Sequence, residues 1–415
     1  MSVQLPKSVQ LKDITAAAEA IEGEVVKTPT VSAQRLGEAF GCDLHLKLEN
    51  FQFTGSFKDR GALNKLKNLE PERARAGVIA MSAGNHAQGV AHHAQRLGIP
   101  ATIVMPEFAP FTKVDRTRGF GAKVVLTGDT LDASAHAARE IAEREGLTFV
   151  HPYDDPLIVA GQGTIGLEML AAVPDLEVLV VPIGGGGLIS GIAIAAKAIN
   201  PDIEIIGVEA ALYPSMYQAL RDEAPHAGGV TLADGIAVKS PGKLTMAIVE
   251  ELVSDILLVD EAAIESAIAN LAESQKVVAE GAGAAGIAAI ASEPGRFAGR
   301  KVGSVICGGN IDLRMLAGVL ARGLMRDGRM ARLRIEIIDR PGQLAKLSQV
   351  IGSAGGNIIE VYHQRLFADV PAKRADVDVV VETRNAEHVA EIVAGLAEAG
   401  FPSRVLSIRS AESDI

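Results

Sequence analysis

The sequence contains no tryptophan, only two cysteines and few aromatic residues, which make up 4% of its 415 positions. The cysteines, Cys42 and Cys307, have no spacing typical of a metal site or a disulfide framework, which predicts a reducing compartment. The first residues lack the basic and apolar regions of a signal peptide. No apolar run is both long enough and poor enough in glycine to span a membrane. We therefore expect a cytoplasmic protein with no membrane partner.

Positive charge is also scarce, since 40 lysines and arginines face 51 acidic residues, for a formal charge of −11. Nucleic acids and anionic membranes bind basic faces, so neither is expected as a partner. Alanine and glycine are abundant instead, and hydrophobic residues make up 48% of the chain. The length exceeds that of one compact core, which predicts two or three domains.

Short β-rich runs alternate with helical patterns over residues 10–320. This alternation predicts an α/β fold with mostly parallel sheets covered by helices on both faces. Several strands end in glycine-rich turns, and open α/β sheets bind ligands at these strand ends. The expected strands are Val78–Met81, Ala101–Met105, Lys123–Leu126, Glu177–Val181, Ile203–Glu209 and Lys301–Cys307, and the expected helices include Asn85–Leu97, Asp132–Glu145 and Glu261–Glu280.

The pattern changes after residue 320. Residues 321–331 are basic and polar and are expected to connect two domains. The order strand, helix, strand, strand, helix, strand then predicts a ferredoxin-like α+β domain over residues 332–410. Residues 1–320 form the first domain, with a smaller lobe at roughly 50–150. The six elements are expected at Leu333–Ile338, Gly342–Ala354, Asn357–Arg365, Asp376–Glu382, Ala386–Ala399 and Arg404–Ile408.

A lysine, Lys58, follows Phe57 at an expected helix start in the run TGSFKDRGA (residues 54–62). A helix N-terminus and apolar packing both lower the pKa of an amine and favour a nucleophile. When the motif is taken alone, a surface lysine is the more common explanation. The run SAGNHAQG (residues 82–89) follows a buried strand, and its backbone N–H groups and Ser82 suit a carboxylate. A plain helix cap is the alternative.

The run GGGGLISG (residues 184–191) lies between another buried strand and a helix. Its four glycines allow backbone N–H groups to converge on a phosphate, although a tight turn without ligand is the alternative. Cys307 begins CGGN at a further strand end, where it is a ligand contact or a small buried hydrophobe. The spacing of His86, His92, His93 and His151 predicts no metal site, and no Ser-His-Asp set is present.

Together these motifs resemble those of fold-type II pyridoxal-phosphate (PLP) enzymes, and within them the threonine ammonia-lyases (threonine dehydratases). The resemblance covers nearly the whole chain and implies a two-lobed catalytic region like that of the tryptophan synthase β-subunit. It rests on TGSFKDRGA, SAGNHAQGVA, AGQGTIGLE (residues 160–168), GGGGLISG and CGGNIDL (residues 307–313), which occur in the family's order.

The resemblance implies a role for each site residue. Lys58 would hold pyridoxal 5′-phosphate as a Schiff base and remove the Cα proton of the substrate. Cys307 would face the pyridine nitrogen, where many relatives have serine. The remaining implied contacts are Phe57 near the cofactor ring, Asn85 at its 3′-oxygen, Gly184, Gly185, Gly186 and Gly187 at its phosphate, and Ser82, Gly84, Asn85 and His86 at the substrate carboxylate.

A neutral Cys307 leaves the pyridine nitrogen unprotonated, which weakens the electron sink and favours prompt β-elimination over transamination. The implied activity is deamination of L-threonine to 2-oxobutanoate and of L-serine to pyruvate. Related racemases carry a second serine before the Gly-Asn pair, where this chain has Ala83, so we expect little racemisation. The alternatives are a 3-hydroxyaspartate ammonia-lyase, a serine racemase and an amino-acid sensor with a retired catalytic domain. Isoleucine biosynthesis and threonine breakdown both remain open as the role.

The C-terminal domain resembles an ACT domain through Arg340-Pro341-Gly342 after its first strand and Gly356-Asn357-Ile358 at the second. ACT domains bind an amino acid between copies, which implies an allosteric effector and a homodimer or homotetramer. A purely structural pairing module is the alternative.

Some relatives bind a cation through a Glu and an Asp. Glu209 matches the first position but Ser215 stands near the second, so no metal is expected.

Overall fold

The computed structural model describes residues 9–364 and 373–406. The chain divides into two compact units, Met1–Ile311 and Asp312–Ile415, which are described separately. That the catalytic domain ends at residue 320 and the C-terminal domain begins at residue 332 stays a prediction. Within the described residues, no helix has the length and apolar character needed to cross a membrane.

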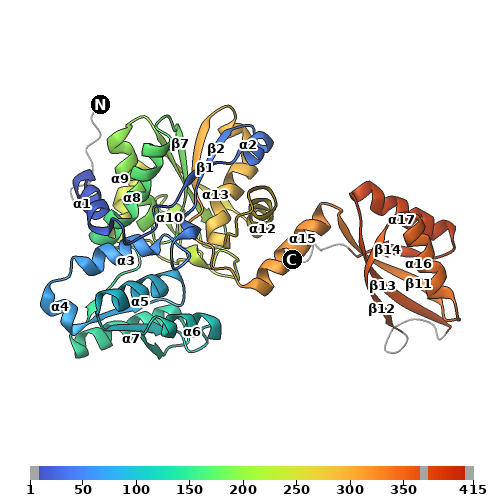
Figure 1. The fold of residues 1–415 in the computed structure, drawn as a ribbon, viewed down its shortest axis with the longest axis horizontal. Coiled ribbons are helices and arrows are strands. Elements are labelled where there is room, and N and C mark those ends of the chain that lie inside the picture. The colour runs from blue at the N-terminus through green and yellow to red at the C-terminus, as the bar shows by residue number, and fades with distance from the viewer. Residues whose placement is uncertain (1–8, 365–372, 407–415) are drawn as a thin grey trace. The chain divides into compact units, whose positions relative to one another are not determined.

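The first unit contains a six-stranded sheet in the order β1-β2-β10-β7-β8-β9, in which only the β1–β2 pair is antiparallel. Helices α1, α8 and α9 lie on one face of this sheet and α13 on the other (Figure 1). Nearly every residue of α9 and α13 is buried, as a sheet covered on both faces requires. The strands are β1 (Thr30–Ser32), β2 (Asp43–Lys47), β7 (Val178–Pro182), β8 (Glu204–Ala210), β9 (Asp255–Val259) and β10 (Lys301–Val305), and the helices are α1 (Leu11–Ile21), α8 (Pro156–Ala172), α9 (Gly187–Ile199) and α13 (Gly281–Ser292).

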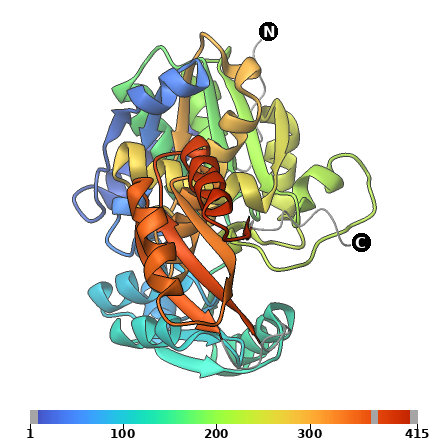
Figure 2. The ribbon, with the colours of Figure 1, turned by 90° about the vertical axis from the view of Figure 1, so that its right-hand side faces the viewer.

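A smaller lobe holds a second, fully parallel sheet in the order β5-β4-β3-β6. It lies beside the six-stranded sheet in both views (Figure 1, Figure 2), and helix α3 (Lys58–Lys67) packs on α5 of this lobe and on α8 of the larger one. Its elements are β3 (Val78–Met81), β4 (Ala101–Met105), β5 (Lys123–Leu126), β6 (Thr148–Phe149), α4 (Pro71–Ala76), α5 (Asn85–Leu97), α6 (Phe111–Gly119) and α7 (Leu131–Glu145).

Of the remaining elements of the first unit, α12 packs on α13 and α11 packs on α9. The helix expected at Glu261–Glu280 is too long: α12 covers Glu261–Asn270, and a π-helical turn, η3, covers Leu271–Gln275. The helical run ends where Lys276 adopts a left-handed backbone conformation with φ 57°. The strand expected at Lys301–Cys307 ends at Val305, because the chain then turns toward Lys58. The other elements are α2 (Gln34–Phe40), η1 (Glu49–Phe51), α10 (Ser215–Ala219), η2 (Asp234–Ile236), α11 (Lys243–Leu252) and α14 (Pro294–Phe297).

The second unit begins with helix α15 (Leu313–Arg326), so residues 321–331 hold the end of a helix, a turn and the start of a strand. Its antiparallel sheet has the order β12-β13-β11-β14, with α16 and α17 packed on one face (Figure 2). The alternating burial of β11 produces the apolar core beneath these helices. Predicted strand residues Arg365, Ser407 and Ile408 lie outside the described residues. The elements are β11 (Met330–Ile338), α16 (Gln343–Ser353), β12 (Asn357–Gln364), β13 (Arg374–Glu382), α17 (Ala386–Glu398) and β14 (Ser403–Val405).

Candidate active site

Lys58 is the first residue of α3 and lies where the two lobes of the first unit meet. Its Nζ donates to the backbone oxygen of Pro152 at 2.7 Å and lies 5.0 Å from the centre of the Phe57 ring. Burial lowers the pKa of Lys58 to about 8, although the nearby Glu280 favours the charged form. A neutral, nucleophilic amine is therefore accessible near neutral pH.

Cys307 follows β10 and is 2% exposed. Its backbone oxygen accepts from the Phe57 N–H at 3.0 Å, which ties the end of β10 to the residue before Lys58. Burial raises the pKa of the Cys307 thiol far above its usual range, and the neighbouring Glu280 adds to this. Cys307 is consequently a neutral thiol at physiological pH.

The four glycines form the turn between β7 and α9, as the sequence pattern predicts. Gly186 has φ 93°, and Gly187 begins the 13-residue helix α9. A Cβ on Gly186 would lie 2.8 Å from the side chains of Met216 and Thr245. The Thr245 hydroxyl also donates to the Gly185 oxygen at 2.6 Å, which holds the turn in place. The backbone N–H groups at the start of α9 are therefore available to an anion, as at other helix N-termini.

The SAGNH run forms the turn between β3 and α5. The Gly84 N–H donates to the Ser82 hydroxyl at 3.1 Å. His86 is 3% exposed, and its Nε2 pairs with the Val150 oxygen at 2.9 Å. Burial, aided by the charge of Lys58, lowers the pKa of His86 to about 3. His86 is therefore neutral at physiological pH, and burial alone accounts for the lowered pKa of Lys58.

Glu280 is a site residue that the sequence interpretation missed. It immediately precedes α13, is 5% exposed, and accepts from Asn85 Nδ2 at 2.7 Å. Burial, with a contribution from Asp234, raises the pKa of Glu280 to about 7. The sequence interpretation assigned Glu280 to the end of the expected helix Glu261–Glu280. A signal that could have found it is the single acidic residue within the otherwise small and apolar run VVAEGAGAAG (residues 277–286).

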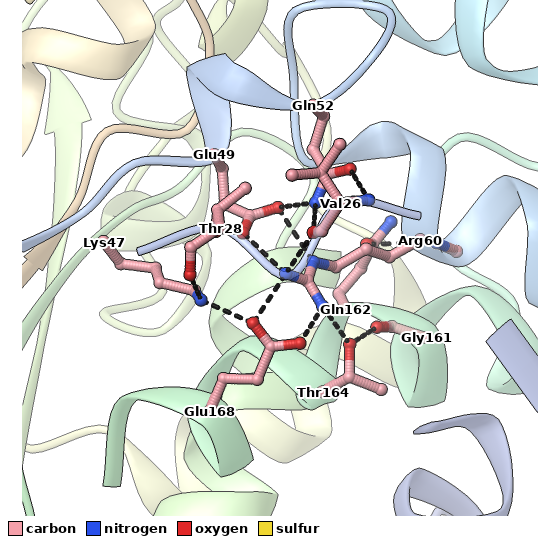
Figure 3. Close-up of polar contacts among 11 residues, drawn as sticks. Val26, Thr28, Lys47, Glu49, Gln52, Arg60, Gly161, Gln162, Thr164 and Glu168 are labelled. Atoms are coloured by element: carbon pink, nitrogen blue, oxygen red, sulfur yellow. Dashed lines mark hydrogen bonds and ion pairs between the residues drawn. The ribbon is translucent and has the colours of Figure 1, made fainter. Parts of the chain in front are cut away.

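A buried cluster of charges supports α3 at Arg60, two residues beyond the lysine (Figure 3). Arg60 is completely buried, and its Nε and Nη2 donate to the two oxygens of Glu49, each at 2.8 Å. Its Nη1 donates to Glu168 on α8 at 2.7 Å, and Glu168 also pairs with Lys47. Two cations thus face two carboxylates, so the cluster is formally neutral. The hydroxyls of Thr28 and Thr164 and the amide of Gln52 complete its hydrogen bonds.

Glu209, which matches the first of the two cation positions of some relatives, caps helix α10. Its carboxylate accepts from the N–H groups of Met216 and Tyr217, both at 2.9 Å. Across residues 9–364 and 373–406, no group of three His, Cys, Asp or Glu side chains is arranged to hold a metal ion.

The residues of this site fit the cofactor implied by the resemblance. The structure brings together a buried amine of lowered pKa, a neutral thiol and an anion site at a helix N-terminus. PLP requires an amine for its aldehyde, a partner for its ring nitrogen and donors for its phosphate. Ser82 lies on the turn before α5, and Asn85 is the first residue of that helix, both on the smaller lobe.

Comparison with known proteins agrees with this arrangement. Residues 21–308 match the family model described as "Pyridoxal-phosphate dependent enzyme", and residues 327–399 match an ACT domain model. The chain is 45% identical to the L-threonine ammonia-lyase of Thermotoga maritima, over 96% of this chain and all of that protein.

Two solved structures are similar to the catalytic unit. A threonine deaminase isoform from Solanum lycopersicum matches with TM-score 0.71 and 36% identity, covering 77% of this chain and 91% of that one. A serine racemase from Dictyostelium discoideum matches with TM-score 0.69 and 36% identity, covering 74% of this chain and all of that one.

The family match covers most of the first unit, and the similarity to the Thermotoga protein extends through both units. The predicted fold class, cofactor and enzyme family are therefore confirmed. This chain belongs to the pyridoxal-phosphate-dependent enzymes of fold-type II, in the threonine ammonia-lyase group with a C-terminal ACT domain.

Proposed function

We propose that this enzyme deaminates L-threonine to 2-oxobutanoate and ammonia, and L-serine to pyruvate, with Lys58 as cofactor anchor and base. The observation that carries the proposal is the buried amine of Lys58, whose pKa is lowered to about 8, beside the neutral Cys307. Bound PLP supplies an electron sink that makes the Cα proton of an amino acid acidic. The similarity to threonine ammonia-lyases supports threonine as the substrate.

Each site residue then has a defined task. The freed amine of Lys58 takes the proton from the substrate Cα, which its lowered pKa favours. The backbone N–H groups of Gly184 to Gly187 would hold the cofactor phosphate. Asn85 would donate to the 3′-oxygen of the cofactor, Phe57 would pack near its ring, and Cys307 would serve as the partner of its ring nitrogen. The turn with Ser82, Gly84 and His86 orients the substrate carboxylate.

The position before Gly84 distinguishes elimination from racemisation. Ala83 has no group that can transfer a proton, so one proton-transfer residue, Lys58, serves the substrate Cα. No side chain at this position can therefore return a proton to the substrate Cα from the side opposite Lys58. This supports ammonia-lyase activity over the serine racemase alternative, even though a racemase is among the similar structures.

We further propose that the C-terminal unit binds an amino-acid effector and pairs with a second copy. The ACT match supports the effector. The edge strand β12 supports the pairing, because its Ile359, Val361 and Tyr362 are 51%, 40% and 47% exposed. Regulation requires that the effector bind two states of the enzyme with different affinity.

The test is a steady-state assay with L-threonine, L-serine and 3-hydroxyaspartate, each repeated with isoleucine, valine or threonine added as effector. We expect 2-oxobutanoate to form fastest, pyruvate more slowly and oxaloacetate least. Lys58→Ala should abolish turnover while the protein remains folded. Retained turnover in that variant, or faster formation of oxaloacetate than of 2-oxobutanoate, would contradict the proposal.

A further inference from the structure

Asn310 lies just beyond β10 and joins three segments of the active site. Its Nδ2 donates to the backbone oxygen of Thr54 at 2.7 Å and to the side-chain oxygen of Asn85 at 2.8 Å. Thr54 precedes Lys58 on the chain, and Asn85 begins α5 of the smaller lobe. Both hydrogens of the Asn310 amide are therefore used, each on a different segment.

These bonds determine which way the Asn85 amide points. Its Oδ1 accepts from Asn310, and its Nδ2 donates to Glu280 at 2.7 Å. A rotation of this amide by 180° would place two N–H groups against each other at Asn310. The Asn310 amide cannot turn to accommodate this, because its Nδ2 also donates to the backbone oxygen of Thr54. The network thus permits one orientation, in which one Nδ2 hydrogen is used on Glu280 and the second is available.

The Asn310 side chain is itself confined. Gly55 has φ 77°, and a Cβ at that position would lie 2.7 Å from the Asn310 side-chain oxygen. The Gly309 N–H also donates to the Gly55 oxygen at 2.9 Å, which keeps the two loops together. Any larger residue at position 55 would push Asn310 away from Asn85.

We propose that Asn310 is a positioning residue that makes Asn85 present an N–H, and not its carbonyl, to the 3′-oxygen of the cofactor. This inference rests on the proposed contact between Asn85 and the cofactor. A donor stabilises negative charge on that oxygen, whereas a carbonyl would repel it. Because Asn85 belongs to the smaller lobe and Asn310 to the larger, the orientation is correct only while the two lobes are joined at this point.

The experiment replaces the donor of Asn310 with an acceptor and measures cofactor binding and its visible absorbance in the full-length enzyme. In Asn310→Asp the new carboxyl group attracts the Nδ2 of Asn85, so that its carbonyl turns toward the cofactor. We expect the dissociation constant for PLP to rise about tenfold or more and the visible absorbance maximum to shift. Asn310→Ser, which removes the amide without adding a charge, should give a smaller change in the same direction.

Two further variants separate positioning from general support of the fold. Asn50→Ala removes another amide, which donates to the Val278 oxygen at 3.1 Å from a neighbouring loop, and should leave affinity and absorbance unchanged. In an Asn85→Ala background, Asn310→Asp should change neither quantity further, because there is no amide left to orient. Far-ultraviolet circular dichroism confirms that each variant is folded.

The outcomes distinguish the inference from the function on which it rests. If Asn85→Ala weakens cofactor binding but Asn310→Asp and Asn310→Ser do not, the positioning role is wrong and the proposed function stands. An effect of Asn310→Asp that persists undiminished without the Asn85 amide also overturns the role. If Asn85→Ala changes neither affinity nor absorbance, the proposed contact with the cofactor is itself wrong.

Discussion

Arg60→Met is predicted to destabilise the catalytic unit strongly, although Arg60 is not proposed to contact cofactor or substrate. The guanidinium is completely buried, donates to both oxygens of Glu49, and also donates to Glu168. Methionine retains much of the apolar stem, so lost packing contributes little. Glu49 loses its bidentate partner while remaining buried. Removing one member of a buried ion pair costs about 3–5 kcal/mol.

Two matched variants test this reasoning. Arg60→Lys retains the charge but cannot bind both oxygens of Glu49 as a planar fork does, so its loss should be intermediate. Combining Arg60→Met with Glu49→Gln removes the unpaired charge, and should recover part of the stability lost by Arg60→Met. The loss in Arg60→Met should also grow with rising pH, because Arg60 now holds the pKa of Glu49 below its usual value despite the opposing effect of burial. Without Arg60 that carboxyl group must lose its proton unaided.

Urea unfolding at fixed excess PLP, followed by the visible circular dichroism of the bound cofactor, measures the effect. The chain has no tryptophan, so tryptophan fluorescence is not an available probe, whereas the cofactor signal reports on the catalytic unit that binds it. The midpoint should fall by about 1 M or more. The reasoning is refuted if the loss is below about 1 kcal/mol, or if the double variant is no more stable than Arg60→Met.

Two other predictions concern the reaction. The rate of PLP incorporation into the apoenzyme should rise with pH and level off above about 8, because burial places the pKa of Lys58 there and only the neutral amine attacks the aldehyde. Stopped-flow absorbance measures this rate. A rate independent of pH between 6 and 9 would contradict the prediction. The Ala83→Ser variant should produce D-serine from L-serine, because a hydroxyl then lies in the loop before Gly84. Chiral chromatography measures the yield, with Ala83→Gly as the control. If no D-serine forms above the control, this position does not transfer protons.

The sequence predicted those parts of the fold whose residues reveal their environment locally. Strands such as Val78–Met81 and Ala101–Met105 are continuous apolar runs, and both have the predicted bounds. The end of α12 was not predictable in this way. The pattern over residues 271–280 continues to suit a helix, whereas the chain must turn at Lys276 to bring Glu280 to Asn85. That requirement comes from contacts 195 residues apart in the sequence.

In the active site, too, the features set by local motifs were predictable and those set by distant contacts were not. The glycine turn and Lys58 were recognisable because motifs of several residues specify them. Arg60 and Glu168 each lie inside one of these motifs, but nothing in the sequence indicates that they pair with each other or with Glu49. Glu280 and Asn310 likewise have no local pattern that indicates a contact with Asn85. Buried polar groups are paired through tertiary contacts, and the sequence does not state which distant residue supplies the partner.

The position of β10 has a consequence for how the enzyme is made. This strand is inserted between β2 and β7, so one of the last segments of the catalytic unit completes the middle of its sheet. During synthesis, Lys58 emerges some 250 residues before the Cys307 and Asn310 that complete its surroundings. Parallel strands that are far apart in the sequence pair slowly. A growing chain therefore cannot close the cofactor site until the unit is nearly complete, and free PLP has access to Lys58 throughout that interval.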